Sequence, residues 1–389
     1  MSAVTVDARD DERSGRRDLR ELDWLMLATL ALCCLGLVMA VSVQGADPQV
    51  GPIQAMKQQG AKLLAALVVF LLAALVPMRI VRRFAMPAFL AATVCCLLPV
   101  VVGRTVNGAH RWIKFGSFNF QPVEPARFFL ILALAWILAR ASHGVGSFRR
   151  GFLPAMGCAG LLAGVLLLQP DHGNALIVLA LASALAFVAG VRMLFFMPFV
   201  GAVVAVFAWF AVRHDYVRQR LVDLMATKPD SQVGLGLIAL SSGGLTGRGL
   251  GQGWMKMDFV PEANNDFVFA IVGEEFGYLG SLFVLAAFTV FGVVGYRLAN
   301  KVHSPFLRYV ICGYSLMVCM QAAMNLLVVS GWAPAKGIDL PFVSTGGTSL
   351  MFCLAAVGLI GNAARADRGG DFAPIDTVAT ANSMFPGRV

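Results

Sequence analysis

Charge is scarce in this sequence. Only 14% of its 389 residues are Asp, Glu, Lys or Arg, whereas 58% are hydrophobic, and the mean hydropathy is +0.75. Soluble domains carry about 25% charged residues, so the composition excludes an ordinary water-soluble domain. Carboxylates are the rarer charge, 22 against 31 Lys and Arg, which leaves a net charge of +9. We attribute the basic excess to membrane topology and anionic lipid, and not to nucleic acid.

Signals of several common enzyme classes are also absent. The glycine-rich stretch at 234–253 lacks the Lys-Ser/Thr ending of a phosphate-binding loop. The eight cysteines have no metal-type spacing, and we expect them to be small apolar residues inside membrane spans. No serine or cysteine stands with a base in a pattern typical of a nucleophile, and no small-residue cleavage site follows the first apolar run, so we expect no cleavable signal peptide. These absences argue against nucleotide binding, a cysteine metal site and covalent catalysis.

Long apolar runs are abundant instead. A helix needs about 20 mostly apolar residues to cross a hydrocarbon core of roughly 30 Å. We predict an all-α integral membrane protein with about ten transmembrane helices between residues 21 and 365, flanked by disordered cytoplasmic tails at 1–20 and 366–389. One long loop at 213–266 separates the seventh and eighth spans, and its apolar part suggests a short interfacial helix. The predicted spans are 24–43, 61–76, 84–102, 122–139, 152–168, 174–190, 193–212, 267–296, 307–330 and 341–363.

Basic residues predict the orientation of the chain, because cytoplasmic loops carry more Lys and Arg. Clusters precede the first span and follow the second, fourth and eighth spans. With ten spans, all four clusters lie on one side, so both termini are expected in the cytoplasm and the 213–266 loop outside it. The cluster residues are Arg9, Arg13, Arg16, Arg17, Arg20, Arg79, Arg82, Arg83, Arg140, Arg149, Arg150, Arg297, Lys301 and Arg308.

Acids gather in one place despite their scarcity. From Asp258 to Glu275, eighteen residues contain five of the 22 carboxylates. Asp266 directly precedes a long apolar run, where it could cap the eighth helix or serve a site. Glu274 would lie about 12 Å deeper along that helix, and a carboxylate at the centre of a span costs about 2.5–3.5 kcal/mol. We expect Glu274 to support a cavity that Asp266 caps, and Glu275 to pack against a basic residue that the sequence does not identify.

A second polar group, NGAHRWIKFGSFNFQPVEPARF, lies at the outer end of the fourth span. Arg111 and Lys114 could form a cationic patch for an anionic headgroup such as phosphate. Pro122 can open a helix, on which Glu124 and Arg127 lie three residues apart and can pair. The alternatives for this group are therefore a headgroup site or a structural ion pair.

Two further groups lie at outer span ends. In QPDHGNA, Asp171 is a turn or cap residue or part of a site. In PAKGIDLPFVSTGGTSL, Pro341 could begin the tenth helix, and the Ser, Thr and Gly residues that follow it could serve either close helix packing or a polar cavity for a lipid headgroup. Gln321 and Asn325 share one helix face and are expected to make inter-helix hydrogen bonds. Acids, cations and polar turns from several loops suit the transfer of a group away from a lipid-linked diphosphate, with cations on the leaving group and a carboxylate taking the acceptor's proton.

Taken together, the four groups resemble the SEDS (FtsW/RodA-type) family of bacterial membrane proteins over about residues 20–365. The stretches at 189–192 and 334–342 look closer to the division-type branch than to the RodA branch. The residues that carry the resemblance are Gly108, Ala109, Arg111, Trp112, Ile113, Gln121, Pro122, Glu124, Gln169, Pro170, Asp171, Gly173, Phe259, Pro261, Glu262, Asp266, Phe267, Glu274, Glu275, Leu340, Pro341, Phe342, Ser344, Gly346 and Gly347.

The resemblance implies a peptidoglycan glycosyltransferase that polymerises lipid II with inversion at the outer face of the cytoplasmic membrane, for division or cell shape. It implies a class B penicillin-binding protein as partner, alongside divisome or elongasome proteins. Asp266 would be the general base for the acceptor hydroxyl. No cofactor is required with certainty, although Asp171, Glu262 and Asp266 could hold Mg²⁺ or Mn²⁺. The expected substrate-binding residues are Arg111, Lys114, Gln121, Glu124, Arg127, Asp171, Glu262, Glu274, Lys336 and Ser344.

The chain departs from the family pattern near the expected base. Asn264 and Asn265 replace the usual His and Thr, Arg127 replaces Lys, and Thr345 replaces Tyr. Two other functions stay open, a lipid II flippase and a non-catalytic scaffold for the transpeptidase. A transporter would favour internal repeats and broken helices near the midplane, and the sequence indicates neither.

Overall fold

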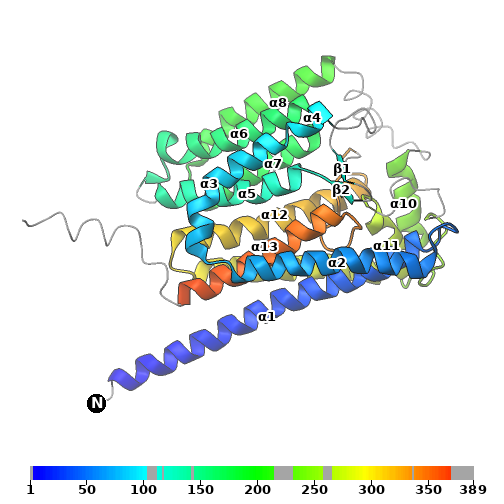
Figure 1. Ribbon diagram of the computed structural model, residues 1–389, viewed down its shortest axis with the longest axis horizontal. Helices are drawn as coiled ribbons and strands as arrows, with labels where there is room; N and C mark the ends of the chain where they lie inside the picture. Colours follow the sequence, from blue (N-terminus) through cyan, green and yellow to red (C-terminus); the bar gives the residue numbers. More distant parts are fainter. Residues whose placement is uncertain are drawn as a thin grey trace, which may run out of the picture.

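The structure, a computed structural model, describes residues 3–102, 112–115, 118–141, 144–213, 231–256, 265–334 and 337–368, and side chains only from residue 20 onward. The described chain is nearly all helical, and each of the ten predicted spans coincides with a helix (Figure 1). These helices are α1 (Ala3–Gln44), α2 (Gly51–Leu75), α3 (Met78–Cys95), α5 (Val123–Arg140), α6 (Leu153–Leu168), α7 (His172–Val188), α8 (Phe196–Arg213), α11 (Val268–Lys301), α12 (Pro305–Val329) and α13 (Gly347–Arg368).

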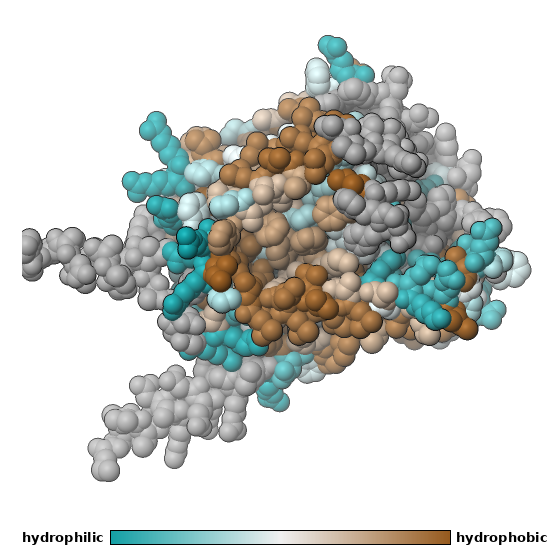
Figure 2. Space-filling view, viewed as in Figure 1, coloured by the Kyte–Doolittle hydropathy of each residue, from teal (hydrophilic) through white to brown (hydrophobic). Residues whose placement is uncertain are grey.

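By length and apolar composition alone, seven stretches of the described chain qualify as membrane spans, and α7 is a shorter apolar helix. The seven include α1 from Arg20, α2, α11, α12 and α13. The surface agrees with a membrane protein, because a hydrophobic band crosses the molecule between hydrophilic groups at its two ends (Figure 2). Such a band is what a bilayer requires of the lipid-facing surface. The prediction of a multi-pass helical membrane protein is confirmed.

Three helices form the centre of the bundle. α5, α12 and α13 pack against one another, and α5 is buried on nearly every face, which is the expected position for a helix that is hydrophobic all round. α2 runs along α13, where Gly358 permits close contact, since a Cβ on Gly358 would lie 2.5 Å from the Phe70 carbonyl oxygen. Most of α2 nevertheless faces outward, and its buried residues are Ala55, Gln59 and Ala66.

The shorter elements gather at one end of the bundle. They include a hairpin of β1 (Ile113–Phe115) and β2 (Phe118–Phe120), in which Lys114 pairs with Asn119, and α10 (Gln232–Ser242). Figure 1 places both at the end opposite the C-terminal end of α13. α4 (Leu98–Val102), η2 (Phe148–Phe152) and η3 (Met193–Phe195) complete the described elements. The helix expected in the 213–266 loop is confirmed as α10, which packs on α11, whereas the hairpin was not predicted.

α11 is not one continuous helix. Gly277 has φ 68° and ψ −158°, so its backbone leaves the helical region. The broken turn bonds to the glycine-rich loop: the Arg248 and Gly249 amides donate to the Glu274 and Glu275 carbonyls, both at 3.0 Å. A Cβ at Gly277 would lie 2.3 Å from the Gly247 nitrogen, so the break depends on glycine. The expectation of unbroken helices is wrong here.

Two helix starts also differ from the prediction. α13 begins at Gly347 and not at Pro341, because residues 341–346 form a turn in which Phe342 has φ 66° and the Ser344 hydroxyl accepts a hydrogen bond from the Leu340 amide. α1 begins at Ala3, within the expected N-terminal tail. The expected C-terminal tail lies almost entirely outside the described residues.

Candidate active site

Asp266 lies in the turn directly before α11 and is half-buried. The N-cap residue of α11 is Phe267, whose side chain makes no capping hydrogen bond, so Asp266 does not occupy the N-cap position that was one of its two alternatives. Phe267 is buried and would meet any side chain at Gly236 of α10, since a Cβ there would lie 2.9 Å from its ring. The Asp266 carboxylate lies beside the backbone of Gly337, 3.4 Å from the position of a Cβ on that glycine. The turn is therefore fixed by its neighbours.

Two elements hold the backbone of this turn. Asn325 on α12 donates from its side-chain amide to the carbonyls of Asp266 and Ile338, both at 2.7 Å. The Ser344 hydroxyl donates to the Asn265 carbonyl at 2.6 Å, and the Thr345 hydroxyl donates to the Asn265 side-chain oxygen at 2.8 Å. Side-chain bonds to backbone carbonyls fix the position of a segment that forms no regular structure. Asn325 was predicted to make inter-helix hydrogen bonds, but its bonds go to the turns before α11 and α13.

A buried ion pair lies behind the same turn. Arg127 and Glu124 of α5 pair at 2.5 Å, and Arg127 is 1% exposed, so the predicted pair is confirmed. Arg127 also donates to the Gln321 side-chain oxygen at 3.2 Å. Gln321 in turn donates to the Asp339 carbonyl at 3.0 Å and to Ser349 of α13 at 3.2 Å. One chain of hydrogen bonds thus runs from the ion pair to the 338–346 turn.

Two hydrogen-bond donors of Arg127 are unsatisfied within the described part of the chain. Its Nε and Nη1 atoms are buried and have no hydrogen-bond partner there. Buried donors of a charged group are costly to leave unpaired, so a water or an anionic group at this position would be stabilised. This observation fits the predicted part of Arg127 in binding an anionic substrate.

Glu274 and Glu275 face the glycine-rich loop. Both are 1% exposed. The Glu274 carboxylate accepts hydrogen bonds from the backbone amides of Trp254 at 2.8 Å and Met255 at 3.2 Å. Glu275 pairs with Lys256 at 2.7 Å, so Lys256 is the basic neighbour that the sequence did not identify. The two acids hold residues 254–256 in place, shortly before the segment that leads to Asp266.

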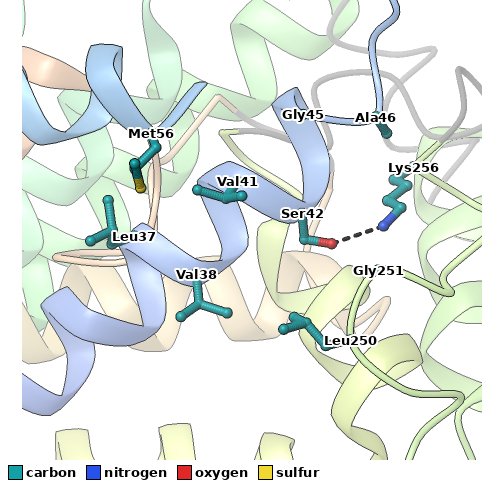
Figure 3. Close-up of a pocket in the computed structure, with 10 residues that line it drawn as sticks. All are labelled: Leu37, Val38, Val41, Ser42, Gly45, Ala46, Met56, Leu250, Gly251 and Lys256. Carbon is teal, nitrogen blue, oxygen red and sulfur yellow. Dashed lines mark hydrogen bonds between the residues drawn. The ribbon is translucent and has the colours of Figure 1, made fainter. Parts of the chain in front are cut away.

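Ser42 of α1 completes this contact. Its hydroxyl donates to Glu275 at 2.7 Å and accepts from Lys256 at 2.8 Å. Figure 3 shows Lys256 reaching from the loop toward Ser42 along the wall of an open groove of about 560 Å³. The rest of the groove is almost entirely apolar and is lined by Leu37, Val38, Val41, Gly45, Ala46, Met56, Leu250 and Gly251.

Asp171 and Gln121 lie on other elements. Asp171 is the N-cap residue of α7, where its carboxylate accepts from the Asn174 backbone amide at 3.3 Å and from the Asn174 side chain at 2.8 Å. Of the alternatives given for Asp171, the structure therefore shows the helix cap. Gln121 is buried directly before α5. Arg111, Glu262 and Lys336 lie outside the described residues, and so does the side chain of Lys114.

Sequence reasoning missed Lys62 on α2. Its amine donates to the Thr345 carbonyl at 2.9 Å, inside the group of bonds that holds Asn265 and Asp266. A signal existed, because a cation within an apolar span is by default functional, and Lys62 is the second residue of the predicted span 61–76. The site therefore draws on α2, α5, α12 and the turns before α11 and α13.

Comparison with known proteins identifies the family. Residues 23–369 match the cell cycle protein family of FtsW, RodA and SpoVE. The chain belongs to this family. The "Probable peptidoglycan glycosyltransferase FtsW" of Geobacter metallireducens is 34% identical to it over 348 residues, which cover 87% of this chain and 93% of that protein. The family assignment confirms the resemblance seen in the four motifs, and the name of this relative agrees with the division-type branch.

Two solved structures of the family share the fold. One is a chain of a peptidoglycan synthase complex that coordinates polymerization and crosslinking. It matches with a TM-score of 0.74 and 28% identity, and the match covers 88% of this chain and 97% of that one. The other is the rod shape determining protein RodA of Thermus thermophilus, with a TM-score of 0.66 and 27% identity over 88% of this chain and 96% of that one. Because each match covers 88% of the chain, this protein shares the fold of these two family members.

Proposed function

We propose that this FtsW/RodA-family protein is a peptidoglycan glycosyltransferase that polymerises lipid II into glycan strands. The observation that carries the proposal is Asp266, a carboxylate directly before α11. Its carbonyl accepts a hydrogen bond from Asn325, and the preceding Asn265 accepts hydrogen bonds from Ser344 and Thr345. A general base must be held within hydrogen-bond reach of the proton that it takes. The support for the substrate is the name of the relative from Geobacter metallireducens together with the motif residues.

The proposed reaction needs one base and several cations. Asp266 takes the proton of the acceptor sugar's 4-hydroxyl as its oxygen attacks the anomeric carbon of the donor. The bond from that carbon to the diphosphate oxygen breaks, the configuration inverts, and the lipid diphosphate leaves with the bonding electrons. Cations stabilise the charge that grows on the leaving group, a part that we assign to Arg111, Lys114, Lys336 and Arg127.

We place the site on the extracytoplasmic side and both termini in the cytoplasm. Support comes from the basic residues after α2, α5 and α11, since cytoplasmic loops are richer in Lys and Arg. The candidate site lies at the end of the bundle opposite the C-terminal end of α13 (Figure 1). A substrate delivered outside the cell would meet it there.

We infer a class B penicillin-binding protein as the partner. The similar chain in the peptidoglycan synthase complex supports this inference, because that complex coordinates polymerization with crosslinking. Crosslinking requires a transpeptidase close to the growing strand. The division or shape machinery would bring both proteins to the same place.

A divalent cation near the diphosphate stays a prediction. Within the described ranges, no three His, Cys, Asp or Glu side chains are grouped as metal ligands. Asp171, one of the expected ligands, already binds Asn174, and Glu262 lies outside those ranges. We therefore route no step of the reaction through a metal ion.

The test uses the purified protein with its partner, given labelled lipid II in detergent. We expect glycan polymer from the native protein and none from Asp266→Asn. Polymer formed equally well by the variant would eliminate the assignment of the base. The break at Gly277 is the one observation that favours a flippase, since transporters use broken helices. Movement of lipid II across liposome membranes without any polymer would decide for that alternative.

A further inference from the structure

We propose that Lys62 is a positioning residue for the glycosyl transfer. It acts on Asp266 through Thr345 and Asn265. This inference rests on the proposed function. Lys62 belongs to none of the motifs that carry the family resemblance, and it lies on α2, far in the sequence from the other residues of the site.

The location of Lys62 is costly unless the residue has a role. It lies on α2, a candidate membrane span whose surface mostly faces outward, and it is the second residue of the predicted apolar run 61–76. Ionisable residues within such spans are costly and usually functional. Lys62 is half-buried and turned toward the turn before α13. A cation in such a place usually faces a partner inside the protein.

Three consecutive contacts connect Lys62 with the proposed base. The Lys62 amine donates to the Thr345 carbonyl at 2.9 Å. The Thr345 hydroxyl donates to the Asn265 side-chain oxygen at 2.8 Å. Asn265 directly precedes Asp266 in the same turn. A hydrogen bond from an ammonium group is roughly twice as strong as one between neutral groups, so Lys62 is well suited to fix the Thr345 backbone.

Asp339 constrains the same turn from its other side. The carboxylate of Asp339 acts electrostatically on Lys62. It also packs directly against Gly346, where a Cβ would lie 2.1 Å from its Oδ2 atom. The turn is thus held between a cation and an anion, with Thr345 in the middle.

The two residues between Lys62 and Asp266 are both departures from the family pattern. Thr345 stands where a Tyr is usual, and Asn265 stands where a Thr is usual. Their hydrogen bond to each other, at 2.8 Å, therefore joins two positions at which this chain departs from that pattern. The docking of α2 on α13 does not need Lys62, because Gly358 already brings the two backbones close together. The chain of contacts consequently serves the position of Asp266 and not the assembly of the bundle.

The first experiment measures glycan polymerisation from labelled lipid II by the complex with the partner. We expect Lys62→Met to lower kcat about 10- to 100-fold with KM changed less than about threefold, since a misplacement of 1 Å can cost about 10²-fold. Lys62→Arg, which keeps the charge and donors, should recover most of the rate. The matched control is Lys301→Met, which removes a lysine paired with Glu21 at 3.0 Å on the C-terminal end of α11, and it should leave kcat unchanged.

A double-mutant cycle tests the path of the effect. Thr345→Val removes the hydroxyl that holds Asn265. If Lys62 acts through Thr345, Lys62→Met together with Thr345→Val should be no slower than the slower single variant. Multiplied losses would show that Lys62 acts by another route and would overturn the proposal.

The remaining outcomes separate this proposal from the proposed function. Wild-type kcat in Lys62→Met, with polymer still absent in Asp266→Asn, overturns the role of Lys62 and leaves the function intact. A rise in KM alone means that Lys62 contacts substrate and is not a positioning residue. No polymer from the native complex, or undiminished polymer from Asp266→Asn, counts against the function itself. If Lys62→Met unfolds at a lower temperature than the native protein, Lys62→Gln, which keeps a donor without the charge, replaces it in every comparison.

Discussion

At the scale of single residues, the polar groups of this membrane protein depend on one another. Arg127 is almost completely buried, and its described charged partner is Glu124. The pair was predictable because its members lie three residues apart on one helix. The contacts of the turn at 265–266 were not, because Asn325, Ser344 and Thr345 come from distant parts of the sequence.

Removing Glu124 should therefore be costly. Glu124→Ala leaves the Arg127 guanidinium buried without its carboxylate, and we expect a loss of about 3–5 kcal/mol in the free energy of unfolding. Thermal unfolding of the purified protein in detergent measures the loss. The control is Glu21→Ala, which breaks the partly exposed pair with Lys301 and should cost less than about 1 kcal/mol. Equal effects of the two variants would contradict the account.

The buried pair of Lys256 and Glu275 offers a sharper residue-scale test. Both side chains are at most 2% exposed, so Lys256→Met or Glu275→Gln alone should cost about 3–5 kcal/mol, because each leaves one buried charge. The double variant should be more stable than either single variant. Additive losses would mean that the two side chains do not depend on each other. Thermal unfolding of the four proteins completes the cycle.

At the scale of the elements, the ten helices could be predicted because each is a long apolar run. Their ends were less accessible to sequence reasoning. Pro341 resembles a helix start, yet the Ser344 side chain bonds to the Leu340 amide and stabilises a turn there instead. The break in α11 was missed because Gly277 looks like any glycine of a membrane helix, and only the loop at 244–249 gives it a different role. The β1–β2 hairpin was missed because its strands are only three residues long.

Gly277→Ala tests the break. Alanine is strained at φ 68° and its Cβ would collide with the Gly247 nitrogen, so we expect a loss of at least about 1–3 kcal/mol in stability and detachment of the glycine-rich loop, seen as faster proteolysis within residues 243–256. Gly164→Ala is the matched control, because nothing lies within 4 Å of its Cβ position in α6. That change should be neutral or stabilising by up to about 1 kcal/mol. A Gly277→Ala protein as stable as the native one would refute the strain argument.

At the scale of the whole molecule, the hydrophobic band separates two polar ends (Figure 2). The candidate site lies at the end of the bundle that carries the β1–β2 hairpin and α10 (Figure 1). The orientation proposed from the basic residues can be measured directly. Gln49 lies in the exposed turn between α1 and α2, and Ser147 lies in the exposed turn after α5. In a background without the native cysteines, Gln49→Cys should react with an impermeant maleimide in intact cells, whereas Ser147→Cys should react only after permeabilisation. The reverse pattern would place the site in the cytoplasm.

The central claim is that Asp266 accepts a proton from the acceptor sugar. The most direct measurement is the rate of glycan polymerisation by Asp266→Asn in complex with the partner, once thermal unfolding has shown that the variant is as stable as the native protein. General base catalysis contributes about 10²- to 10⁴-fold, and the account predicts a loss of rate within or beyond that range. A folded Asp266→Asn protein that polymerises lipid II within tenfold of the native rate would contradict it.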